Sequence, residues 1–128
     1  MSTPTFRHLG QSGSQPTAEL DTFPAPPDLC IVRFTTHELT SFCPVTNQPD
    51  LSTVEIAYAP DELCIETKSL KLYFWSFRDR GIFVEALASE IARHIFDAVR
   101  PWDVEVTVTQ QVRGGIVTKA EARIERED

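Results

Sequence analysis

The strongest constraint on the fold is a long amphipathic helix pattern with strand-like stretches on either side of it. Between Ile82 and Val99 apolar residues recur every three or four positions, which predicts a helix of about five turns. Pro101 should end this helix, because proline cannot continue the helical hydrogen-bond pattern. A second stretch, "SLKLYFWSF", predicts an earlier helix over residues 69–77, with Gly81 as its stop signal.

The flanking stretches are apolar or alternate between apolar and polar residues, as strands do. The predicted strands cover residues 29–34, 52–58, 103–112 and 116–125. The resulting order is β-β-α-α-β-β, so we expect an α+β fold in which an antiparallel sheet carries two helices on one face. Such a sheet has uncovered edges that further copies of the chain can cover, and we therefore expect a homo-oligomer.

The domain organisation follows from a change in composition. Residues 1–28 are rich in Pro, Ser, Thr and Gly, which predicts an N-terminal arm that is ordered only where it docks. Residues 29–128 are expected to form one domain. The formal net charge of −7 disfavours direct binding to nucleic acid. No stretch has the length and apolarity of a membrane span or a secretory signal, so we expect a cytoplasmic protein that does not bind membranes.

A proline-bracketed segment, "SFCPVTNQPD", carries one thiol and one carboxylate, Cys43 and Asp50. Pro44 suits the first position of a helical turn, and a thiol just before such a turn gains nucleophilicity from the peptide dipoles. A nearby carboxylate could shuttle its proton. The competing interpretation is that Cys43 is packing and Asp50 a turn former. That interpretation suits Cys30 and Cys64, which lie in apolar runs.

Two kinds of chemistry are disfavoured. The three cysteines have no zinc-binding spacing, so no metal site is predicted. No histidine is positioned by the sequence as a base for Cys43, which argues against a cysteine hydrolase.

Three stretches in order, "FCPVTNQPD", "IETKSLKLYFWSFR" and "FVEAL", with "VRGGI" after them, resemble one family. They are similar to the short, single-module form of the QueF family, the NADPH-dependent 7-cyano-7-deazaguanine reductases of queuosine biosynthesis. The resemblance implies the tunnelling fold, whose units assemble into rings, and a decamer of two pentamers. It also implies reduction of a nitrile to a primary amine with NADPH.

The resemblance assigns roles to individual residues. Cys43 would add to the nitrile carbon to give a covalent thioimide, and Asp50 would donate a proton to the nitrile nitrogen. Glu66 and Glu85 would accept hydrogen bonds from the N–H groups of the deazapurine base. The helix residues around Glu85 are apolar, so we expect poorly solvated surroundings for it. The full set of expected substrate-binding residues is Ile65, Glu66, Thr67, Val84 and Glu85.

The expected NADPH-binding residues come from two of the matching stretches, because no GxGxxG motif is present. They are Thr67, Lys68, Lys71, Arg113 and Gly114. One departure from the family is Val84, which stands where a histidine is usual.

Two other functions stay open. One is an amidinotransferase that forms the same thioimide and acts on tRNA, as archaeal relatives do, although these lack the "ETKSLKLY" run. The other is a non-catalytic ring that binds a purine-like ligand, which the presence of both Cys43 and Asp50 disfavours.

Overall fold

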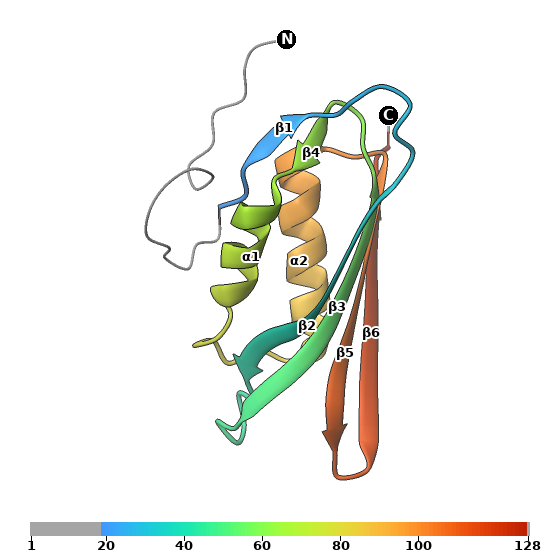
Figure 1. Ribbon diagram of the computed structural model, residues 1–128. Coiled ribbons are helices and arrows are strands. Elements are labelled where there is room, and N and C mark those ends of the chain that lie inside the picture. Colours follow the sequence, from blue (N-terminus) through green and yellow to red (C-terminus); the bar gives the residue numbers. More distant parts are fainter. Residues whose placement is uncertain (1–18, 128) are drawn as a thin grey trace.

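A four-stranded antiparallel sheet forms the body of the molecule, with both helices on one face (Figure 1). The computed structural model describes residues 19–127. The strand order is β2-β3-β5-β6, and the two helices separate the first pair of strands from the second. The bounds are Val32–Phe42 for β2, Pro49–Ala59 for β3, Thr67–Trp75 for α1, Val84–Val99 for α2, Asp103–Arg113 for β5 and Ile116–Glu125 for β6. The predicted α+β class and the β-β-α-α-β-β order are confirmed.

The core lies between the sheet and α2, as the periodicities predict. In β5 every second residue, Val104, Val106 and Val108, is fully buried, and the intervening residues face away. Ile91 and Ile95 of α2 are equally buried and pack in the same cluster. The αL backbone of Arg100 caps α2 just before Pro101, so this helix ends where the sequence indicated.

The N-terminal arm contributes an element that the sequence did not predict. Strand β1 (Thr22–Pro24) pairs with β4 (Leu63–Ile65) in a small second sheet beside α1 (Figure 1). The docked part of the arm therefore reaches the start of α1. The rest of the arm, residues 1–18, lies outside the described residues.

Two expectations about boundaries are wrong. Helix α1 ends at Trp75 with Ser76 as its cap, and Gly81 instead forms an isolated bridge with Phe42. Strand β2 continues to Phe42 and β3 begins at Pro49, so the expected loop is shorter than its sequence suggested. A bulge between Thr36 and Leu39 explains the miss, because it moves the buried positions of β2 to the odd-numbered residues.

Candidate active site

The candidate nucleophile lies in the tight turn that joins β2 to β3. The amide of Cys43 donates to the carbonyl of Gln48 at 2.9 Å, and the amide of Asn47 donates to the carbonyl of Cys43 at 2.8 Å. Asn47 has a φ of 58°, a left-handed conformation that asparagine tolerates well. Cys43 therefore stands at the start of a single helical turn, as predicted.

The surroundings of Cys43 favour its thiolate form. The side-chain hydroxyl of Thr46 is the main cause that lowers the pKa of this thiol, and the backbone amides of Thr46 and Val45 act in the same direction. Partial burial and the charge of Asp50 oppose them. A lowered pKa at a partly accessible cysteine is typical of a reactive thiol.

Asp50 is a strand residue on the buried face of the sheet. It lies opposite Ser41 in the register of β2 and β3, and only 4% of it is exposed. It shares its face with Ser52 and Val54, which are also buried. The interpretation of Asp50 as a turn former is therefore wrong, and its carboxylate acts electrostatically on the Cys43 thiol.

The linker between the helices, residues 76–83, brings the start of α2 to this turn. The amide of Phe42 donates to the carbonyl of Arg80 at 2.8 Å, and the amide of Ile82 donates to the carbonyl of Phe42 at 3.0 Å. Val84 and Glu85 follow directly in the first turn of α2. Val84 is buried, but Glu85 is exposed, so the expectation of poorly solvated surroundings for Glu85 is wrong within one chain.

The other predicted carboxylate, Glu66, caps the N-terminus of α1. Its Oε2 accepts from the amide of Lys68 at 2.7 Å and its Oε1 accepts from the amide of Ser69 at 2.8 Å. Two bonds to Asp21 connect this cap to the docked arm: the amide of Glu66 donates to the Asp21 carbonyl, and the amide of Asp21 donates to the Ser69 hydroxyl. Glu66 is buried and its orientation is fixed, whereas the neighbouring Thr67 is exposed.

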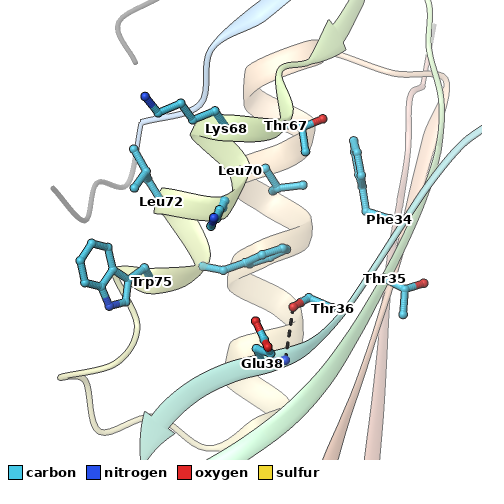
Figure 2. Close-up of a pocket in the computed structure, with 11 residues that line it drawn as sticks. Phe34, Thr35, Thr36, Glu38, Thr67, Lys68, Leu70, Leu72 and Trp75 are labelled. Carbon is cyan, nitrogen blue, oxygen red and sulfur yellow. Dashed lines mark hydrogen bonds between the residues drawn. The ribbon is translucent and has the colours of Figure 1, made fainter. Parts of the chain in front are cut away.

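A groove between α1 and β2, with a volume of about 810 Å³, holds the predicted cofactor lysines (Figure 2). Phe34 of β2 faces Thr67 and Leu70 across it, and Lys68 extends from the side of α1 away from Phe34. The volume is within the range of small-molecule sites. Apolar and aromatic walls suit the rings of a dinucleotide, and lysine ammonium groups suit its phosphates. The apolar and aromatic part of the groove therefore suits the rings of NADPH. The residues that line it are Phe34, Thr35, Thr36, Glu38, Thr67, Lys68, Leu70, Lys71, Leu72, Phe74 and Trp75.

The predicted site residues form two groups within one chain. The turn with Cys43, the start of α2 with Glu85, and the β5–β6 turn with Gly114 lie toward the lower end of the molecule in Figure 1. Residues 65–68 lie at the upper end of α1, whose nine residues span about 13 Å at 1.5 Å each. One chain therefore does not bring Glu66 to Cys43. It also separates Lys68 and Lys71 from Arg113 and Gly114, which lie at the turn between β5 and β6. Both glycines of this turn, Gly114 and Gly115, have positive φ.

Sequence reasoning missed several residues that hold these groups in place. Thr46 had a readable signal, a hydroxyl three positions after the cysteine within a turn-forming segment. Asp21 had none, because its contact with α1 is long-range. Tyr73 and His94, treated only as helix residues, join α1 to α2 through a 2.8 Å hydrogen bond between the Tyr73 hydroxyl and His94 Nδ1.

Two negative findings apply to residues 19–127. Within this range no three His, Cys, Asp or Glu side chains are grouped so that they could hold a metal ion. Neither of the helices described there has the length and apolarity needed to cross a membrane.

Comparison with known proteins shows which sequences this chain resembles. A family model described as "QueF-like protein" matches residues 49–128. A relative from Alkalilimnicola ehrlichii, named NADPH-dependent 7-cyano-7-deazaguanine reductase, is 47% identical over 107 residues, which are 82% of this chain and 83% of the relative. A relative of the same name from Nitrosococcus oceani is 43% identical over 111 residues, 85% of this chain and 86% of its own length.

One solved structure is also similar. It is a crystal structure of an archaeosine synthase, QueF-Like, in the apo form, and it superposes with a TM-score of 0.69 at 29% sequence identity. The superposition covers 73% of this chain and 91% of the archaeosine synthase chain.

Proposed function

This chain belongs to the QueF-like family, and from that membership we propose that it reduces 7-cyano-7-deazaguanine to 7-aminomethyl-7-deazaguanine with NADPH. Within the structure, the strongest support for this proposal is the placement of Cys43 and Asp50 at the β2–β3 turn. There a thiol with a lowered pKa lies in the electrostatic field of a buried carboxylate. A nitrile carbon is a weak electrophile that a thiolate can attack, and the nitrogen then needs an acid.

The proposed covalent step uses Cys43 and Asp50. The sulfur of Cys43 bonds to the nitrile carbon while one π bond of the C≡N group opens, and the electron pair moves to the nitrogen. Asp50 passes the proton released by the thiol to that nitrogen, which gives a neutral thioimide. The hydroxyl of Thr46 and the backbone amides of Val45 and Thr46 stabilise the thiolate before attack. NADPH, when bound, supplies the hydride equivalents of the four-electron reduction to the amine.

Substrate recognition is assigned to the two glutamates. Each carboxylate can accept two N–H groups of the base side by side. Glu66 is held in one orientation by the amides of Lys68 and Ser69, which fixes the remaining lone pairs of its oxygens. Glu85 stands at the start of α2, close in sequence to the linker that contacts the Cys43 turn.

The separation of these groups supports a site shared between copies of the chain. A base bound to Glu66, at the N-terminus of α1, does not also reach Cys43 of the same chain, whose turn contacts the linker beyond the other end of α1. We assign the missing half of each site to a neighbouring copy in a homo-oligomer, a decamer of two pentamers. Lys68 and Lys71 of one copy and Arg113 and Gly114 of another would then hold one NADPH. A cytoplasmic location belongs to the same proposal, because NADPH and reduced thiols are maintained there.

The decisive assay has two parts. Absorbance at the NADPH band should fall when 7-cyano-7-deazaguanine is added. Without NADPH, intact-protein mass spectrometry should show a gain of one nitrile per chain. Cys43→Ala should abolish both signals, and the matched controls Cys30→Ala and Cys64→Ala should keep both. An adduct mapped to Cys30 or Cys64 would contradict the mechanism.

Mixing two inactive variants tests the shared site. Cys43→Ala and Glu66→Gln chains, refolded together, should regain activity that neither has alone. In the mixed oligomer some sites combine an intact Glu66 from a Cys43→Ala chain with an intact Cys43 from a Glu66→Gln chain. If each site lay within one chain, the mixture would stay inactive.

The similarity to an archaeosine synthase favours one alternative function, the amidinotransferase. Both candidates begin with the thioimide and differ in what consumes it. Adduct that disappears on addition of NADPH identifies the reductase, and adduct that survives NADPH identifies the transferase.

A further inference from the structure

We propose that the linker, residues 76–83, sets the position of the Cys43 thiol relative to Glu85. The ion pair between Arg80 and Glu90 holds this linker on α2. The inference rests on the proposed function and adds positioning residues to it, since neither Arg80 nor Glu90 touches the reacting atoms.

The linker completes the hydrogen bonding of the residue before the nucleophile. Phe42 lies opposite Pro49 at a non-hydrogen-bonded position of the ladder, next to the hydrogen-bonded pair Cys43 and Gln48, so its N–H and C=O point away from β3. On that side the Phe42 carbonyl accepts from the Ile82 amide at 3.0 Å, and the Phe42 amide donates to the Arg80 carbonyl at 2.8 Å. Buried backbone groups need such partners. The end of β2 is therefore fixed by the linker, and Cys43 is the next residue.

The same linker is in contact with the turn and continues into α2. A Cβ atom on Gly81 would lie 3.4 Å from the Cα of Pro44, so the linker and the Cys43 turn lie close to van der Waals contact. Two residues later Phe83 caps α2, and Glu85 is in its first turn. A shift of the linker would therefore change the distance between the thiol and the carboxylate that binds the base.

The two hydrogen bonds between Arg80 and Glu90 oppose such a shift. The guanidinium donates to both oxygens of Glu90, with 3.0 Å between Nη2 and Oε1, and lies 5.1 Å from the centre of the Phe77 ring. This hydrogen bonding lowers the pKa of the Glu90 carboxyl, which keeps the pair charged. Bidentate arginine–carboxylate pairs fix geometry as well as charge. Through this pair the linker is joined to α2.

The first experiment separates positioning from binding. Arg80→Ala and Glu90→Ala should each slow formation of the Cys43 adduct ten- to a hundredfold, on the order expected when reacting groups are misplaced by about 1 Å. Measured in a Cys43→Ala background, the affinity for 7-cyano-7-deazaguanine should stay unchanged. The matched control is Asp97→Ala, which removes an ion pair with Arg93 elsewhere on α2 and should leave the adduct rate unchanged.

The double variant tests whether the two residues act as one unit. Arg80→Ala with Glu90→Ala should be no slower than the slower single variant, because residues in one ion pair are not additive. The inference is overturned if Glu90→Ala reacts at the wild-type rate, if affinity falls by the same factor as the rate, or if the two effects multiply.

Amide hydrogen exchange tests the linker without any substrate. The Phe42 and Ile82 amides should exchange faster in Glu90→Ala than in the wild type or in Asp97→Ala. Unchanged exchange would overturn the inference even in an active enzyme. A wild type that forms no adduct would instead refute the proposed function, while the exchange data still decide whether the ion pair holds the linker.

Discussion

Replacing Glu66 should lower both the stability of the fold and the affinity for substrate, because its carboxylate caps α1 in addition to its proposed role in substrate recognition. Both oxygens accept backbone amides at the N-terminus of α1, at 2.7 and 2.8 Å, and the residue is only 7% exposed. Loss of an N-cap costs about 0.5–2 kcal/mol, and a hydrogen bond to a charged group contributes about 1.5–3 kcal/mol. We expect Glu66→Ala to lower the free energy of unfolding by about 2 kcal/mol.

Urea denaturation measures this loss, and Glu85→Ala is the matched control. With a slope of about 1–3 kcal/mol per molar urea, Glu66→Ala should lower the midpoint by about 1 M. Glu85 is exposed and lies in the first turn of α2, where only a favourable dipole interaction of about 0.3–1 kcal/mol would be lost. All variants must be compared at one protein concentration, because assembly also contributes to stability.

Substrate affinity should respond differently from stability. If both glutamates bind the base, each alanine variant should lose about 1.5–3 kcal/mol of binding free energy by calorimetry. Glu66→Ala should also lose about 2 kcal/mol of stability, which is more than the loss of about 0.3–1 kcal/mol expected for Glu85→Ala. Equal urea midpoints for the two variants would refute the reasoning about the cap, and unchanged affinity in Glu85→Ala would refute its assignment to the base.

Three further predictions concern the thiol, the helices and the assembly. Thr46→Val should raise the pKa of Cys43, so that alkylation by iodoacetamide needs a higher pH than in the wild type. Thr46→Ser keeps the hydroxyl and should keep the wild-type dependence of alkylation on pH. An unchanged pH dependence in Thr46→Val would contradict the role of the hydroxyl. Tyr73→Phe removes the hydrogen bond to His94 and should cost about 0.5–1.5 kcal/mol in urea denaturation, and an unchanged midpoint would count against that contact. Light scattering at micromolar concentration should give an oligomer mass, and a monomer mass would disprove the shared site.

The parts of the fold that sequence predicts are those with one uninterrupted period. Val104, Val106 and Val108 keep strict alternation, and α2 keeps its helical spacing from Val84 to Val99. Both patterns arise because one face of each element is buried against the other. The order of elements and the class of fold follow from them.

The missed parts depend on contacts between distant residues or on a broken period. The bulge after Thr36 changes which residues of β2 face inward, so no single period describes that strand. Gly81 was expected to end the first helix because glycine often follows a helix, but it lies in the linker and forms a bridge with Phe42. The separation of Glu66 from Cys43 is likewise invisible in sequence, since a motif gives residue types and not their positions in the fold.

The three cysteines show how placement rather than residue type decides reactivity. Cys64 is buried in β4, and burial raises the pKa of its thiol, which makes it the inert packing residue that its apolar surroundings predicted. Cys30 was expected to pack in the same way and is instead exposed before β2. Only Cys43 combines partial exposure with a hydroxyl and two amides that favour the thiolate. The backbone that presents those amides is a turn closed by a hydrogen bond to Gln48 and preceded by Phe42, which bonds to the linker, so we expect the reactivity of the thiol to depend on the hairpin and on the helix junction together.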